Sequence, residues 1–171
     1  MVAGNSRQAL VDFYHLILHA GSTHEGFENM IFPWKDRLVD PRCPSPHAWA
    51  AAKTAFLIRN FMLHEYGGNI ENASERDLYI YPVVSPAWTK PGEHLAMVNA
   101  PSEFGLITSR MDFTKDGATL TYSPLYNESQ PRSVRLRIPY FKELKSFKTD
   151  ASKSYVEDNC IVLSSDFTTL Q

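Results

Sequence analysis

The period of the apolar residues changes once along the chain, at Gly67 and Gly68. Before this pair, apolar residues recur every three or four positions, which is the period of an amphipathic helix. After it, short runs rich in Val, Ile, Tyr, Phe and Thr are separated by turn residues, which is typical of β-strands. The change predicts an α+β chain, with a helical segment over residues 1–68 and an antiparallel β-sandwich domain over residues 69–171.

Two helices are predicted in the first segment. The apolar residues of the first helix recur at helical spacing at Leu10, Phe13, Tyr14, Ile17 and Leu18. Two such helices form a hairpin that leaves each apolar stripe half covered. We therefore expect the pair to pack on the sandwich, on a second copy of the chain, or on a domain that this sequence lacks.

The second helix carries clear signals for both of its ends. Ser45 is expected to be its N-cap, with Pro46 in the first helical position, where a missing N–H is tolerated. Gly67 and Gly68 are expected to end it. One predicted stripe runs along this helix and consists of Trp49, Ala52, Phe56, Arg59 and Leu63.

Seven short runs predict the strands of the sandwich. They are DLYIYPVVS, HLAMVNA, FGLITSRMDFT, ATLTYSPLY, SVRLRIPYF, LKSFKTD and CIVLSSDFTTL. Lys115 to Gly117 predict a tight hairpin between two of them. Val134, Leu136 and Ile138 alternate with two arginines, which places these three apolar residues on one face of a strand.

Composition excludes two classes of partner. The formal net charge is -2 and no basic stripe is present, so nucleic-acid binding is not expected. No apolar run reaches the roughly 20 residues of a membrane-spanning helix, so no membrane is expected either. Asp12, His15 and His19 interrupt the apolar N-terminal stretch, which argues against a signal peptide. We expect the chain as it stands to be cytoplasmic, and the location of a longer parent stays open.

No cofactor or metal is expected. His15 and His19 lie four residues apart, as two zinc ligands on one helix face would, but this face overlaps the apolar stripe. Cys43 and Cys160 lie in different halves of the chain, and we expect both to be free thiols.

The connection between the two predicted helices carries more chemistry than a linker needs. Residues 21–37 read GSTHEGFENMIFPWKDR and hold two glutamates, a histidine, a tryptophan, two phenylalanines and a terminal Lys-Asp-Arg. A plain linker would consist of Gly, Ser and Pro with scattered charge. The segment is therefore interpreted as the floor of a site.

The order of motifs resembles one known architecture. The strings THEGFENMIFPWKDR, SPHAWAAAKTAFLIRNFMLHEYG and LYIYPVVSPAWTKPGEHLAMVNAPSEFG follow one another over roughly residues 10–110. Together they resemble the C-terminal end of large bacterial glycosidase-like proteins built on a six-hairpin (α/α)6 toroid. The resemblance implies that the helices form the last toroid hairpin and that the sandwich braces it. The remaining hairpins and the general acid would come from outside this sequence, so the chain is expected to be inactive alone.

The resemblance also implies a catalytic carboxylate. Inverting glycosidases use a general acid and a general base about 6.5–9.5 Å apart, with a water between the base and the sugar. The resemblance implies that the general base is a glutamate in the loop before the last long helix. Glu28, within GFEN, is the first candidate for that base, and Glu25 is the second.

Six further residues are candidates for substrate binding. They are His24, Phe27, Trp34, Arg37, His47 and Trp49. Four of them also have a structural interpretation. The two tryptophans can be core residues, His47 can cap the second helix, and Arg37 can form an exposed ion pair with a neighbouring aspartate.

Two functions of different classes follow. The first is a C-terminal part of a glycoside hydrolase that acts on an oligosaccharide or glycoside and needs the missing toroid or a second copy of the chain. The second is a non-catalytic carbohydrate-binding or accessory β-sandwich module.

Overall fold

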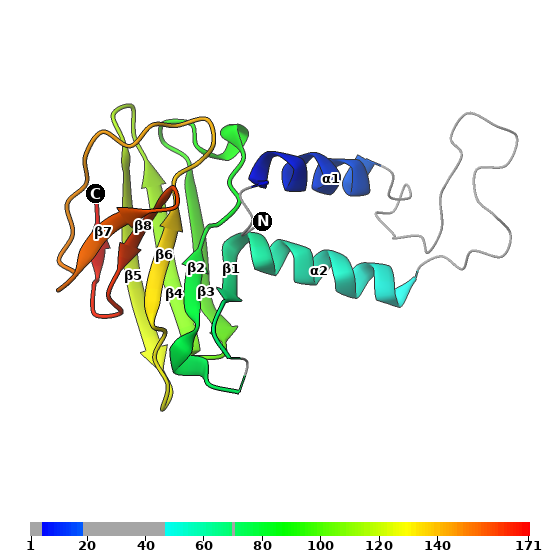
Figure 1. Cartoon of the computed structure of the whole chain (residues 1–171). Helices are drawn as coiled ribbons and strands as arrows, with labels where there is room; N and C mark the ends of the chain where they lie inside the picture. Colours follow the sequence, from blue (N-terminus) through cyan, green and yellow to red (C-terminus); the bar gives the residue numbers. More distant parts are fainter. Residues whose placement is uncertain (1–4, 19–46, 70) are drawn as a thin grey trace, which may run out of the picture.

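The computed structural model describes residues 5–18, 47–69 and 71–171. Within these ranges the fold is α+β: two layers of mainly antiparallel strands form a sandwich, and two helices extend from one side of it (Figure 1). The helices are α1 (Ser6–Leu18) and α2 (Ala48–Met62), with short 3-10 turns η1 (Ala73–Glu75) and η2 (Pro86–Trp88). The strands are β1 (Leu63–Tyr66), β2 (Asp77–Ile80), β3 (His94–Ser102), β4 (Gly105–Phe113), β5 (Ala118–Tyr126), β6 (Ser133–Arg137), β7 (Ser154–Glu157), β8 (Cys160–Leu163) and β9 (Thr169–Leu170).

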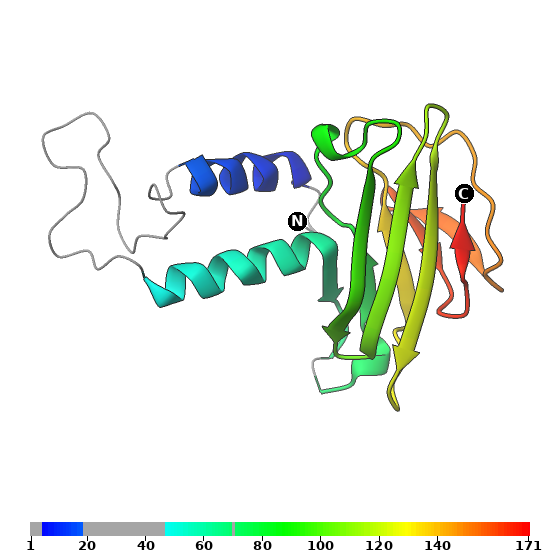
Figure 2. The same cartoon turned by 180° about the vertical axis from the view of Figure 1, so that it is seen from behind.

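The sandwich consists of a five-stranded sheet in the order β1-β2-β6-β8-β7 and a four-stranded sheet in the order β3-β4-β5-β9. Figures 1 and 2 show the first sheet in front of the second and then the reverse. Neighbouring strands are antiparallel except β2 and β6, which pair in parallel with Asp77 opposite Ser133. The prediction of an antiparallel sandwich is wrong at this pair. The chain leaves β2, builds three strands of the other sheet, and returns in the same direction as β6.

The core lies between the two sheets and follows the alternation of the strands. Val134 is buried there, and Leu136 and Ile138 pack against the core, as the alternating pattern of β6 predicted. The predicted Lys115–Gly117 hairpin joins β4 to β5, where the backbone N–H of Thr114 donates to the carbonyl oxygen of Gly117 at 2.9 Å. Strand alternation and turn chemistry therefore specify this part of the fold.

A second apolar cluster packs the first half of α1 and the last turn of α2 against the sandwich. Leu10 and Phe13 of α1 pack with Phe61 of α2 and with Val83, which follows β2. The rings of Phe13 and Phe61 meet edge to face with centroids 5.2 Å apart. Trp88 also packs against this cluster. The segment after β2 thus joins both helices to the sheets.

The second helix, α2, is shorter than predicted at both its N-terminal and its C-terminal end. It begins at Ala48 with His47 as the N-cap, whereas Ser45 had been expected to cap it. It ends at Met62, because Leu63–Tyr66 leaves the helix and pairs with β2 as an edge strand, with Leu63 opposite Ile80. Within the described residues, no helix is long and apolar enough to cross a bilayer.

Near the C-terminus one predicted strand is wrong and one strand was not predicted. The run at residues 144–150 forms only an isolated bridge between Thr149 and Leu170, and Ser154–Glu157 forms a strand that the pattern missed. The carboxylate of Asp150 holds this region to β9 by accepting from the Thr168 hydroxyl and from two backbone N–H groups. The Thr168 hydroxyl and these N–H groups lower the pKa of Asp150 to about 2.

Gly105 is a position where the fold requires glycine. Its φ is +117°, and a Cβ there would lie 2.3 Å from the carbonyl oxygen of Leu125. We predict that Gly105→Ala lowers the free energy of unfolding by about 2–4 kcal/mol. Gly117→Ala is the matched control, because nothing lies within 4 Å of its added Cβ. Urea denaturation measures both, and equal stabilities of the two variants would contradict this account.

Candidate functional site

Most of the residues predicted to form a site lie outside the described residues. They are His24, Glu25, Phe27, Glu28, Trp34 and Arg37. Their roles in catalysis and substrate binding stay predictions, as does the state of Cys43. The other two candidates, His47 and Trp49, lie at the start of α2.

His47 and Trp49 differ in what holds them. The Nδ1 atom of His47 accepts a hydrogen bond from the backbone N–H of Ala50 at 3.4 Å, so this side chain caps α2. Trp49 is 66% exposed within the described residues, with the Nζ of Lys53 5.9 Å from its ring centroid. Trp49 is therefore a surface residue within the part of the chain that the structure describes.

Away from His47 and Trp49, several charged and polar side chains lie close together at the edge of the sandwich, where α2 ends. Here β1 and β3, which are edge strands of the two sheets, meet the end of the helix. A surface pocket of about 520 Å³ opens at this junction. Its lining residues, which define the junction pocket, are Phe56, Arg59, Asn60, His64, Glu65, Arg76, Pro101, Ser102 and Glu103.

Arg59 is the centre of the junction pocket. Its guanidinium donates two hydrogen bonds to the carboxylate of Glu65, at 2.5 and 2.6 Å. It also donates to the carbonyl oxygens of Leu63 and Pro101, each at 2.9 Å. One planar side chain thus connects α2 to β1 and to the end of β3. The fork of donors suits this role, because it binds a carboxylate with two parallel bonds.

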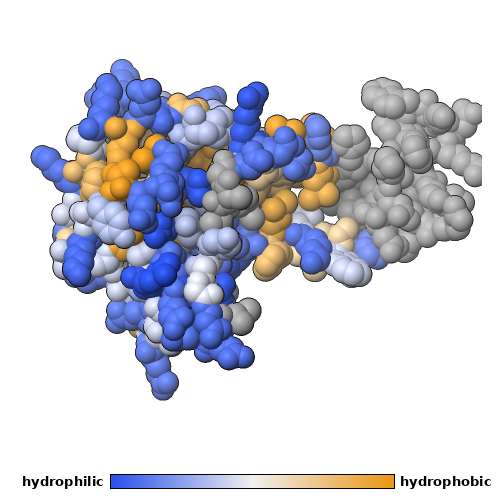
Figure 3. Space-filling view, in the orientation of Figure 1, coloured by the Kyte–Doolittle hydropathy of each residue, from blue (hydrophilic) through white to orange (hydrophobic). Residues whose placement is uncertain are grey.

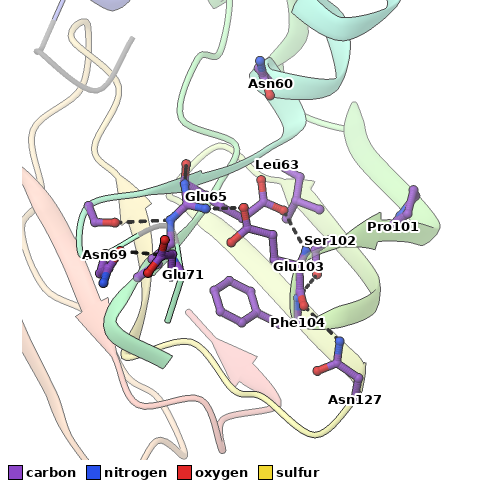
Figure 4. A network of polar contacts seen from close by, with 12 residues as sticks. Asn60, Leu63, Glu65, Asn69, Glu71, Pro101, Ser102, Glu103, Phe104 and Asn127 are labelled. Atoms are coloured by element: carbon purple, nitrogen blue, oxygen red, sulfur yellow. Dashed lines mark hydrogen bonds and ion pairs between the residues drawn. The ribbon is translucent and has the colours of Figure 1, made fainter. Parts of the chain in front are cut away.

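A second ion pair continues the network into the β3–β4 turn. Arg76 pairs with Glu103, and its Nη2 also donates to the carbonyl oxygen of Glu65 at 3.2 Å. The backbone N–H of Glu103 donates to the carboxylate of Glu65, and the Asn127 amide donates to the Glu103 carbonyl oxygen at 2.9 Å. Figure 4 shows Glu65 and Glu103 side by side, with Asn60 above them on α2. The β3–β4 turn is therefore hydrogen-bonded to Glu65 of the five-stranded sheet and to Asn127, which follows β5 of the four-stranded sheet.

The charges of the junction pocket cancel at neutral pH. Burial alone would raise the pKa of Glu65, but the hydrogen bonds and positive charge of Arg59 outweigh it and lower that pKa. Burial lowers the pKa of His64, which keeps its imidazole neutral. Two arginines and two glutamates remain, so the pocket carries no net charge.

Asn60 is the buried polar side chain of the junction pocket with spare hydrogen-bonding capacity. It is 5% exposed, and its Oδ1 accepts from Arg59 at 3.3 Å. Among the described residues, nothing accepts a hydrogen bond from its Nδ2 group. The Oδ1 atom is on the side of Arg59, and Figure 4 shows the amide nitrogen on the side away from Glu65 and Glu103.

A separate polar cluster lies on the outer face of the five-stranded sheet. Asp77, which is 4% exposed, accepts two hydrogen bonds from Arg132 and one from Ser133. Arg135 lies 3.0 Å from the same carboxylate and also pairs with Glu157. The partners of Asp77 satisfy it fully, so this cluster holds β2 to β6 and is not a candidate site.

The described residues contain no group of three or more His, Cys, Asp or Glu side chains arranged to hold a metal ion. Cys160 is a buried free thiol, and burial raises its pKa, so the thiol form persists at neutral pH.

The sequence did not predict the junction pocket. Arg59 was assigned to an apolar stripe, and Glu65 was assigned to the same helix, where a separation of six residues would keep the two side chains apart. They meet because the helix ends between them and β1 turns back beneath it. No local motif signals a contact of this kind.

The chain matches no family model, and no curated protein matches its sequence.

We predict that Glu65→Gln destabilises the chain by about 1–3 kcal/mol at neutral pH, because it leaves Arg59 without its charged partner. The folded-state pKa of Glu65 is below the ordinary value of a glutamate, 4.5, so its stabilisation is present above that value and is lost as the pH falls through the folded pKa. Urea denaturation across this range should show the difference between wild type and variant shrinking at acidic pH. A difference that is independent of pH would contradict the ion-pair role.

Proposed function

We propose that the chain forms the C-terminal part of a glycoside hydrolase, in which the sandwich braces a larger helical domain. In this proposal α1 and α2 are the last hairpin of that domain, and the segment between them carries Glu28 as the general base. The observation that carries the proposal is that both helices are firmly attached at their bases but leave apolar side chains uncovered further along.

The inner side of α1 shows this contrast clearly. Leu10 and Phe13 are 4% and 7% exposed, whereas Ile17, on the same side of the helix, is 43% exposed. Leu18 at the end of α1 is 76% exposed. Figure 3 shows hydrophobic side chains on the helices outside the sandwich. An apolar face that is half covered within one chain indicates a further packing partner.

The outer side of α2 has the composition of a helix–helix contact. Ala48, Ala51, Ala55 and Ile58 share one side of the helix and are exposed, with Ile58 at 45%. Small side chains let a second helix approach closely, and Ile58 supplies apolar area. A helical domain is therefore the partner that fits this surface best, and we name the surface of these four residues the alanine face.

The sandwich provides rigid support in this proposal. The cluster of Leu10, Phe13, Phe61 and Val83 fixes the helices by apolar packing, and Arg59 fixes α2 by hydrogen bonds to both sheets. These contacts set the direction in which the helices leave the sandwich. A fixed direction is what a general base needs, because its distance from the general acid determines whether a water fits between base and sugar.

The second candidate function is a carbohydrate-binding module without catalysis. The junction pocket favours it, because the pocket lies entirely within the described residues and needs no other domain. Sugar binding without any hydrolytic partner would support this alternative.

We predict that the isolated chain self-associates through its uncovered helices. Replacing Ile17 and Ile58 with lysine should shift the mass measured by light scattering to that of a monomer, because charge opposes burial of these faces. Val98→Lys is the matched control, since Val98 is 75% exposed on the sandwich and should leave association unchanged. A wild-type chain that stays monomeric at all concentrations would contradict the need for a partner.

We predict that Glu28→Gln lowers kcat by at least about a hundredfold in an enzyme assembled with the remaining helical domain, because an amide cannot accept the proton from water. Glu25→Gln serves as the comparison, and its loss of rate should be smaller. Stability should stay close to wild type in both variants. A normal rate for Glu28→Gln would end its assignment as the base.

A further inference from the structure

One row of side chains on α2 leads from the start of the helix into the junction pocket. Trp49, Phe56 and Asn60 recur at i, i+7 and i+11, which places them on one side of the helix, with Lys53 between the first two. Trp49 and Phe56 are 66% and 59% exposed. This row is separate from the alanine face, so a domain that covers the alanine face can leave the row open.

The charges of the junction pocket restrict the ligands that it can hold. Arg59 and Arg76 are each paired with a glutamate, so no free cation awaits a phosphate or carboxylate. The carboxylates of Glu65 and Glu103 are neutralised in the same way, so they offer no strong cation site. A neutral ligand is the class that this pocket accepts without breaking an internal ion pair.

The hydrogen-bonding groups of the pocket are mixed. Glu103, whose side chain is 39% exposed, lines the pocket and retains acceptor capacity beyond its bond with Arg76. His64 adds an imidazole with one donor and one acceptor atom. A ligand that both donates and accepts at several neighbouring positions matches this set, and adjacent hydroxyl groups do so.

The ring of Phe56 provides the apolar wall of the pocket. It lies one turn before Asn60 on the same side of α2 and remains exposed in the absence of a ligand. An exposed aromatic face beside fixed polar groups suits a ligand with one apolar face and polar edges. The C–H faces and hydroxyl edges of a pyranose ring have this character.

From the neutral charge, the mixed hydrogen-bonding groups and the exposed ring, we propose that the junction pocket is a binding subsite for a neutral sugar. Phe56 stacks on the ring of the sugar, His64 offers a donor and an acceptor atom to one hydroxyl, and Glu103 accepts from a neighbouring hydroxyl. The pocket, of about 520 Å³, is open to the surface, so a sugar can reach Phe56 and Glu103 from outside. This subsite does not depend on Glu28 or on hydrolysis.

Amide NMR spectra of the isotope-labelled full chain test the proposal. The neutral probes are glucose, galactose, mannose, maltose and cellobiose, and the charged probes are glucuronate and inorganic phosphate. We expect at least one neutral sugar to shift the Asn60 side-chain amide and the backbone signals of Ser102 and Glu103. The charged probes should leave these signals unchanged.

Three variants locate the binding. Phe56→Ala should weaken the affinity about tenfold or more, whereas Phe56→Tyr keeps a ring and should retain it. Tyr140→Ala is the matched control, because Tyr140 is a 47% exposed aromatic residue outside the pocket. Unchanged signals from the sandwich core show that each variant is folded.

Several outcomes would overturn the subsite. They are the absence of shifts with every neutral sugar, equal affinity in Phe56→Ala and wild type, or binding of phosphate or glucuronate alone. Because binding is measured without turnover, these outcomes leave the Glu28 proposal untouched. Loss of the Glu28 assignment or of self-association would equally leave the subsite standing.

Discussion

The guanidinium of Arg59 is the contact on which the position of α2 depends. It joins a helix to an edge strand of each sheet by bonding Glu65 and the carbonyl oxygen of Pro101. Helix ends normally leave carbonyl oxygens unpaired, and here the side chain of the last turn also bonds the oxygen of Leu63, where the helix becomes β1. Arg59 therefore holds the point where helix becomes strand, and together with the apolar cluster around Phe61 it fixes the direction of the helix.

The sandwich buries its own apolar core, whereas the two helices leave apolar side chains exposed. The two sheets bury a continuous core, whereas within residues 5–18, 47–69 and 71–171 the buried apolar cluster of α1 and α2 lies only at their ends next to the sandwich. Within a single chain, uncovered apolar faces favour association with other helices. The alanine face and the row from Trp49 to Asn60 lie on different sides of α2. In our proposal the first side packs on a helical domain, and the second side contacts sugar.

Sequence patterns predicted the parts of the fold that depend on local chemistry. Alternation in β6 correctly placed Val134 in the core, and the change of period predicted strands after Gly68 but missed β1, which lies before it. Residues 63–66 were assigned to a helix because Gly67 and Gly68 were expected to end it, whereas in the structure they pair with β2. The pair of Arg59 and Glu65 was not predictable for the same reason, since it exists only after the chain reverses. The Glu28 segment lies outside the described residues and stays a prediction.

Native-state hydrogen exchange tests the central claim, which is that Arg59 makes the end of α2 part of the sandwich. The account predicts that the amides of residues 59–62 exchange as slowly as those of β1 and in the same cooperative unit. In Arg59→Met, residues 59–62 should exchange faster while the core strands keep their protection. If the last turn of α2 already exchanges rapidly in the wild type, as an isolated helix does, the account is contradicted.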